Sequence, residues 1–183
     1  MRQTLPLRRV VALSLLLSLR SVMGSSPGGS TFDQYQVKAL FLCNFAEFVE
    51  WPERPFESAS QPMTICVMGP DPFGHWLEDA VKGRMLGERS FSARRISKLG
   101  DAKSCRVLFV SSSGKNLSAL LSGLTSTGVL TVGESEAARE AGVVVTFAME
   151  GRKVRFGINS DAAEREKLRF SSKLLSLSQA AKK

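Results

Sequence analysis

Few side chains in this sequence are of the types that catalyse reactions. His75 is the single histidine, and it stands beside Trp76 directly after the turn sequence PDPFG. The sequence has no HExxH motif, no histidines, cysteines and carboxylates at metal-ligand spacing, and no GxSxG nucleophile elbow after a predicted strand. A Ser–His–Asp hydrolase built on His75 is the remaining enzymatic interpretation, but a lone histidine more often simply begins a helix. We therefore expect no catalytic site and no metal site.

Two loops that follow predicted buried strands could hold a small ligand. The loop SSSGKN, residues 111–116, opens a predicted helix, so its backbone amides and the side chains of Ser112, Ser113 and Lys115 could bind an anion. It lacks the first glycine and the final Ser/Thr of a P-loop, which argues against nucleotide hydrolysis. The loop GPDPFG, residues 69–74, follows the first strand, near the point where doubly wound sheets bind ligands. Its prolines remove amide donors, so we interpret it as a rigid turn that presents Phe73. Simple helix capping is the alternative role for the SSSGKN loop.

These loops must be positioned by an alternating series of strands and helices. Apolar runs bounded by turn residues predict buried strands at 63–69, 105–111 and 128–133, with a polar, edge-like strand at 88–96 and a hairpin from 142–150 and 152–160. Helical patterns cover 33–50, 74–81, 115–124, 135–140, 159–167 and 170–180. The alternation predicts one three-layer α/β/α domain over residues 32–180. Its sheet should be mostly parallel, in the flavodoxin-like order 2-1-3-4-5, with an antiparallel edge hairpin.

The first predicted helix carries most of the aromatic side chains. Asp33 is its expected N-cap, and Pro52 ends it. A single apolar stripe, which we expect to face the core, is formed by Val37, Phe41, Phe45 and Phe48 and is widened by Leu40, Cys43 and Val49. Beyond the helix, Trp51, Pro52 and Phe56 either seal the edge of the core or form a partner-binding patch together with Phe73 and Trp76.

The three cysteines suit an oxidising compartment, where two would pair. In the predicted strand order the first strand lies beside the third, which makes Cys66 and Cys105 the natural pair and leaves Cys43 as a free thiol. Three reduced, separately buried thiols are the alternative. A disulfide that closes this loop would stabilise the fold by roughly 4 kcal/mol.

The N-terminus is typical of an exported protein. Residues 1–24 combine a basic start with the apolar run VVALSLLLSL and predict a secretory signal peptide, followed by a flexible leader at 25–31. The apolar run is shorter than the ~20 residues that span a bilayer. The net charge of +8 falls to +4 without the four arginines of this segment, and the remaining basic residues are not interleaved with aromatic side chains. We therefore expect a periplasmic protein that does not bind nucleic acid.

The ordered set of motifs resembles the YfiR-like family. The helix YQVKALFLCNFAEFVEWP, residues 35–52, is similar to the family pattern V-K-A-x-F-L-x-N-F-x-x-F-V-x-W-P. MTICVMGPDPFG and GRMLGERSFSARRI are similar to the strand, turn and edge strand that follow. The later segments keep the family order: CRVLFVSSS, GVLTVGES, GVVVTFAMEGRKVRFGIN and FSSKLLSLS. The resemblance covers about residues 35–178.

This resemblance implies a regulator and not an enzyme. Its implied partner is a membrane-bound diguanylate cyclase of the YfiN type, repressed through its periplasmic part, so that release raises cyclic-di-GMP and promotes biofilm growth. The resemblance also implies an α/β domain, often a homodimer, with the Cys66–Cys105 disulfide. A second disulfide of the family has no counterpart, since no cysteine follows Cys105. A periplasmic small-molecule or anion sensor is the alternative function.

Overall fold

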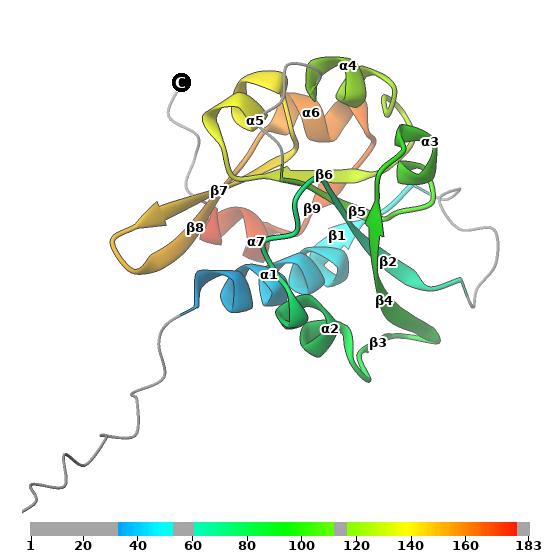
Figure 1. Ribbon diagram of the computed structural model, residues 1–183. Helices are drawn as coiled ribbons and strands as arrows, with labels where there is room; N and C mark the ends of the chain where they lie inside the picture. The colour runs from blue at the N-terminus through cyan, green and yellow to red at the C-terminus, as the bar shows by residue number, and fades with distance from the viewer. Residues whose placement is uncertain (1–32, 53–60, 112–116, 179–183) are drawn as a thin grey trace, which may run out of the picture. The chain divides into compact units, whose positions relative to one another are not determined.

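A computed structural model describes residues 33–52, 61–111 and 117–178 of the chain (Figure 1). The predicted signal peptide and leader lie outside these residues, as do Phe56 and the loop that carries Ser112, Ser113 and Lys115. Everything described belongs to one compact unit, Phe32–Lys183.

A mixed, mostly parallel sheet of seven strands forms the centre of the domain, in the order β3-β4-β2-β5-β6-β7-β8. Its five parallel strands are β2 (Met63–Met68), β4 (Arg89–Ile96), β5 (Val107–Val110), β6 (Leu130–Gly133) and β7 (Val145–Glu150). These five confirm the flavodoxin-like order 2-1-3-4-5. The antiparallel hairpin of β7 and β8 (Lys153–Ile158) is also confirmed. The short β3 (Met85–Leu86) adds an unpredicted antiparallel edge beside β4.

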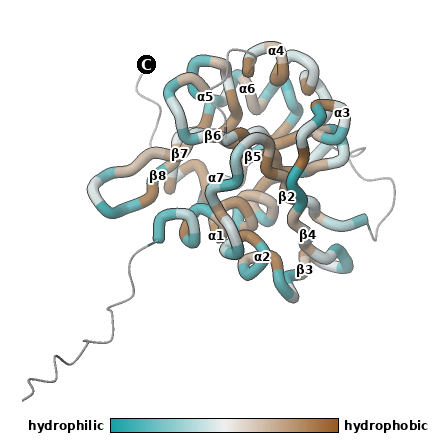
Figure 2. Tube along the Cα trace, viewed as in Figure 1, coloured by the Kyte–Doolittle hydropathy of each residue, from teal (hydrophilic) through white to brown (hydrophobic). Residues whose placement is uncertain are grey.

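Helices cover both faces of this sheet, which confirms the three-layer fold (Figure 1). One face packs against α1 (Gln34–Phe48), α2 (His75–Val81) and α7 (Ser172–Leu177). The other packs against α3 (Leu99–Ala102), α4 (Leu117–Ser122) and α5 (Glu136–Ala141). Helix α6 (Ser160–Arg165) follows the hairpin and lies beside α4 and α5. Figure 2 shows the hydrophobic residues concentrated along the central strands.

The buried strands divide their side chains between two hydrophobic cores. On β2, Ile65 and Val67 point into the first core, whereas Cys66 and Met68 point into the second. This alternation is the period of two that a strand imposes, and all six residues of β2 are buried. It explains why the strand reads as a continuous apolar run in the sequence.

Side-chain caps fix the starts of several helices as their sequences indicate. Asp33 accepts a hydrogen bond from the Tyr35 N–H at 2.8 Å, and Ser135 accepts one from the Ala138 N–H, so both predicted caps are confirmed. Gly142 ends α5 with φ of 88°, a conformation that favours glycine. A side chain at Gly133 would collide with Ala138, so the glycine allows α5 to lie directly against β6.

Two details of the predicted first helix are wrong. Leu40 and Phe48 are 45% and 36% exposed, so neither is a core residue, while Phe45 is fully buried as expected. The helix also ends at Phe48 instead of Glu50. The next two residues form β1 (Val49–Glu50), which pairs antiparallel with β9 (Arg169–Phe170) near the C-terminus. This ladder was not predicted, because two residues carry no detectable period.

Candidate partner-binding surface

Helix α1 packs most of its apolar side chains into the first core and leaves two of them exposed. Its buried side consists of Lys38, Ala39, Leu42, Cys43, Phe45 and Ala46. Val37 and Phe41 are half-buried and still pack against the first core, whereas Leu40 and Phe48 are exposed. Leu40 and Phe48 make the outer side of α1 a candidate contact with another protein.

The N-terminal half of α1 forms a shallow groove with α2. Leu40 and the half-buried Trp76 lie in this groove, which has a volume of about 200 Å³, and Gln36, Asp79 and Ala80 complete its lining.

The Trp76 indole N–H donates to the Asp33 carboxylate at 2.7 Å, which fixes the ring. This bond and the Tyr35 backbone N–H hold the pKa of Asp33 below its usual value, with the backbone bond as the larger cause. The groove thus has a positioned aromatic wall and an acidic rim at Asp79. We name the residues Gln36, Leu40, Trp76, Asp79 and Ala80 the α1–α2 groove.

The predicted aromatic patch is not brought together as one surface. Phe73 is 1% exposed and packs edge-on against Phe109, with ring centroids 4.8 Å apart, so it is a core residue. Its assignment to a partner-binding patch is therefore wrong, because the turn points the ring inward. Trp76 of α2 is bonded to Asp33 at the start of α1, whereas Trp51 follows the end of α1, and a helix of this length is roughly 22 Å long.

Trp51 and Pro52 lie at the edge of the first core. The Trp51 indole packs against that core, and its N–H donates to the Ala46 carbonyl at 3.4 Å. Pro52 lies so close to Gly128 that a Cβ there would meet its ring at 3.1 Å. These contacts favour the sealing role over the partner-binding role. Because both residues are only half-buried, a contribution to partner contact stays a prediction.

The PDPFG turn is held rigidly by one arginine. Arg95 donates to the Asp71 carboxylate at 2.6 Å and to the Gly74 carbonyl at 2.9 Å, and it also pairs with Glu78. Asp71 in turn accepts from the Phe73 N–H at 2.8 Å. His75, which follows this turn, is exposed and lies 3.8 Å from Asp79, an i,i+4 neighbour. Its described contacts are those of a residue at the start of a helix.

A buried charged pair behind α1 was missed in the sequence. The Lys38 side chain is 4% exposed, and its ammonium lies 2.6 Å from the Glu134 carboxylate and 2.9 Å from the Gln34 amide oxygen. The Tyr35 hydroxyl donates to the same carboxylate at 3.1 Å. Burial, and then the charge of Glu134, raise the pKa of Tyr35. The sequence contained a signal for this ion pair, because Lys38 lies among the buried residues of α1 and a buried lysine requires a partner.

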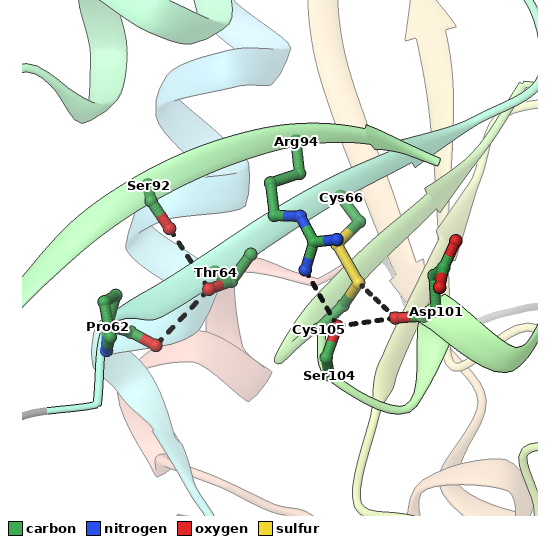
Figure 3. Close-up of a disulfide and its surroundings, with 8 residues drawn as sticks. All are labelled: Pro62, Thr64, Cys66, Ser92, Arg94, Asp101, Ser104 and Cys105. Carbon is green, nitrogen blue, oxygen red and sulfur yellow. Dashed lines mark hydrogen bonds between the residues drawn. A yellow bond between two sulfur atoms is a disulfide. The ribbon is translucent and has the colours of Figure 1, made fainter. Parts of the chain in front are cut away.

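The Cys66–Cys105 disulfide is present (Figure 3). It crosslinks β2 to Cys105, which lies two residues before the start of β5. The Cα atoms are 5.8 Å apart, within the usual range, and the bond closes a loop of 39 residues. Cys43 is the free, buried thiol. Burial raises the pKa of Cys43 to about 11, so it stays protonated at neutral pH.

A second cavity, of about 230 Å³, opens between α4, α5 and α6. Glu166 lines it and accepts hydrogen bonds from three consecutive backbone N–H groups, those of Ser126, Thr127 and Gly128, at 3.1 to 3.2 Å. Burial raises the pKa of Glu166, and these three donors oppose the shift.

The described residues contain no group of three potential metal ligands. Across the same residues no helix is both long and apolar enough to cross a membrane.

The seven-stranded, mostly parallel sheet with helices on both faces defines a three-layer α/β domain. The chain belongs to the YfiR/HmsC-like family, whose model matches residues 35–179. The family is known for periplasmic regulators of cyclic-di-GMP signalling and not as a class of enzymes. This match confirms the resemblance noted in the sequence.

Comparison with solved structures gives distant neighbours. A conserved domain protein from Vibrio cholerae has a TM-score of 0.49 at 11% identity, with 66% of this chain and 55% of that chain covered. An ABC domain from Streptococcus pneumonia, solved in complex with L-Trp, has a TM-score of 0.43 at 9% identity, with 64% and 55% covered. The match thus spans about half the length of each neighbour. No curated protein matches the chain significantly.

Proposed function

We propose that this protein is a periplasmic repressor of an inner-membrane diguanylate cyclase, which it inhibits by binding the periplasmic part of that enzyme. The family match over residues 35–179 carries this proposal. The exposed outer side of α1 supports it, because a regulator that acts by contact needs an accessible apolar surface.

The α1–α2 groove is the proposed contact site. Leu40 and Trp76 supply the apolar anchors, and Asp79 supplies a polar rim. The protein would bind the inactive state of the cyclase more tightly than the active state, and so shift the population towards the inactive state. An envelope signal that weakens this contact would release the enzyme, because the two binding events share one coupling free energy.

The primary test is the cellular cyclic-di-GMP level in three strains. One lacks this protein, one lacks the candidate membrane cyclase, and one lacks both. The proposal predicts a rise in the first strain that disappears in the third. An unchanged level in the first strain would contradict repression of any cyclase.

The contact site is tested by complementing the first strain with variants. Leu40→Ser combined with Trp76→Ala should fail to lower cyclic-di-GMP, although the protein accumulates normally. Met85→Ser is the matched control, because Met85 is 53% exposed but lies on β3 at the sheet edge. Full repression by the groove variant would mean that the protein represses the cyclase through a different surface.

The cavity between α4, α5 and α6 favours a second candidate function, sensing of a small molecule. It combines hydroxyl side chains with apolar walls, as small-molecule sites do. Screening of small periplasmic metabolites for thermal stabilisation tests it. The variant Ala141→Leu would fill the cavity. A ligand that stabilises the wild type but not this variant would support the sensor. A ligand that stabilises both proteins equally would show that its site lies elsewhere.

A further inference from the structure

The central sheet ends on one side at β8, and no described strand lies beyond it. The strand runs over Lys153–Ile158 without a proline, and it has no bulge, since each of its residues pairs with one residue of β7. Figure 1 shows the hairpin of β7 and β8 projecting from the body of the domain. An uncovered edge strand of this kind is a template for pairing with another strand.

Every second residue of β8 directs its backbone groups away from β7. The Asn159 N–H donates to the Val144 carbonyl at 2.8 Å, and the opposed residues of an antiparallel ladder alternate between bonded and non-bonded pairs. The N–H and C=O groups of Val154, Phe156 and Ile158 therefore point outward. Among the described residues, no backbone hydrogen bond from outside the ladder reaches these groups.

The side chains of these outward-facing positions hold the edge in place. Val154, Phe156 and Ile158 are at most 8% exposed, because their side chains lie in the first core. The Phe156 ring contacts Phe45 and Phe41, with ring centroids 5.0 and 5.5 Å apart. The edge is therefore already ordered, and pairing with another strand costs it little conformational entropy.

The opposite edge of the sheet is better protected against pairing. There β3 covers the start of β4, and the rest of β4 carries the exposed charged residues Arg94 and Arg95. Charged side chains at an edge discourage the approach of another strand. On β8, Lys153 occupies the first position, and the Arg155 guanidinium is already bonded to Glu150 at 2.8 Å. The second half of β8 carries no charge.

The edge of β8 is complementary to itself in one antiparallel register. When Phe156 lies opposite the second copy's Phe156, Val154 lies opposite the second copy's Ile158, so the outward-facing groups of both edges form bonded pairs. On the other face of the sheet, Arg155 then lies opposite Gly157, which has no side chain to oppose it. No two like charges lie directly opposite each other.

The two neighbouring registers are unfavourable. If Val154 were at the centre, Lys153 would lie opposite the second copy's Arg155, and this like-charge pair would occur twice. If residue 158 were at the centre, the pairing would need extended backbone where α6 already begins. The strand thus specifies the register centred on Phe156.

We propose that two copies of this protein pair through β8, edge to edge and antiparallel, with Phe156 on the two-fold axis. The pairing joins the two central sheets into one continuous sheet. The contact is isologous, so it closes at the dimer and leaves neither copy with an open edge at β8. It goes beyond the proposed repression of a cyclase and requires no partner enzyme.

Sedimentation velocity of the purified chain without its predicted signal peptide, residues 25–183, tests the pairing. We expect a dimer that dissociates on dilution. In hydrogen exchange, the amides of Phe156 and Ile158 should exchange more slowly as the dimer forms, because only the second copy bonds them. A protein that stays a monomer up to roughly 0.1 mM would overturn the proposal. A dimer that leaves these two amides unprotected would overturn it as well, since that dimer would use another surface.

The variant Val154→Pro locates the interface. It removes one outward-facing N–H from each copy, and an edge strand tolerates proline where the N–H faces solvent. It should weaken the dimer about tenfold, because two hydrogen bonds across the symmetric contact are lost.

The matched control is Val154→Ala, which removes side-chain volume but keeps the N–H. It should dimerise nearly as the wild type does, and circular dichroism reports the folding of both variants. Equal weakening by the two variants would attribute the effect to the first core and contradict pairing through the edge. A folded Val154→Pro protein that dimerises like the wild type would also contradict it.

Discussion

The two faces of the central sheet are stabilised in different ways. The first core holds six buried phenylalanines, Phe45, Phe73, Phe91, Phe109, Phe147 and Phe156, beneath the 15-residue α1. The second core, in the described residues, holds no aromatic side chain and is covered by helices of four to six residues. It contains the disulfide, and the larger of the two cavities opens where its helices α4 and α5 meet α6. Interlocked rings therefore stabilise one face, whereas a covalent bond compensates for thinner packing on the other.

The aromatic face should show the largest single effect. Phe45 contacts Phe41, Phe147 and Phe156 with ring centroids 5.0 to 5.9 Å apart. Phe45→Ala should lower the free energy of unfolding by about 3–5 kcal/mol, because it removes buried area and leaves a cavity. Urea unfolding followed by circular dichroism measures this loss. Phe48→Ala is the control and should cost less than about 1 kcal/mol. Equal losses would mean that the rings do not carry the stability of this face.

Removal of the disulfide should destabilise the other face by less. Cys66→Ala combined with Cys105→Ala should cost about 2–4 kcal/mol, because the unfolded chain regains the freedom of the closed loop. Urea unfolding gives the value, and hydrogen exchange should show faster opening of β5 and α3 than of α1. A reducing agent should not destabilise the double variant further, since Cys43 is unpaired. Uniformly faster exchange over both faces would contradict the separation of the two cores.

The buried ion pair tests whether charge also stabilises the first face. Glu134→Gln should cost roughly 2 kcal/mol, because it leaves the Lys38 ammonium buried without a counter-charge, although Glu134 itself is partly exposed. Lys38→Met added to Glu134→Gln should recover most of this loss. A double-mutant cycle by urea unfolding measures the coupling. Additive losses would show that the two charges do not depend on each other.

Glu166 should give the smallest effect, visible only as a pH dependence. Its pKa is raised in the folded protein, so the stability it contributes is present below its unfolded pKa and is lost as the pH rises through the folded pKa. Glu166→Gln cannot ionise. The unfolding free energy of the wild type relative to this variant should therefore fall as the pH rises from the ordinary glutamate pKa of 4.5 through the higher folded pKa. A rise over the same range would mean that the three backbone donors outweigh burial.

The sequence predicted the order of the sheet because that order follows from period and alternation. Short, continuous apolar runs bounded by turn residues, such as residues 63–68, favour strands covered on both sides, and helices between such strands favour parallel neighbours. The Cys66–Cys105 pairing followed from the same order. The β1–β9 ladder and β3 could not be predicted, because two-residue strands depend on tertiary contacts.

The candidate surface was predicted less well than the fold. The sequence placed an aromatic cluster near α1 but could not separate its buried members from its exposed ones. Phe73 and Trp76 are three residues apart, yet one is inside and the other lines a groove, because the Arg95-bound turn sets the direction of each ring. The groove also depends on how α2 lies across α1, which no local pattern encodes.

The β1–β9 ladder joins the end of the first helix to nearly the last described residues of the chain. Contacts between such distant segments require the closure of a long loop, which makes them late events in folding. During synthesis the N-terminal half of the chain emerges first, and the end of α1 then waits for the C-terminal segment. Until that segment arrives, Val49, which is 5% exposed in the folded protein, lacks its partner strand, and the emerging chain offers chaperones and proteases an apolar site that folding later closes.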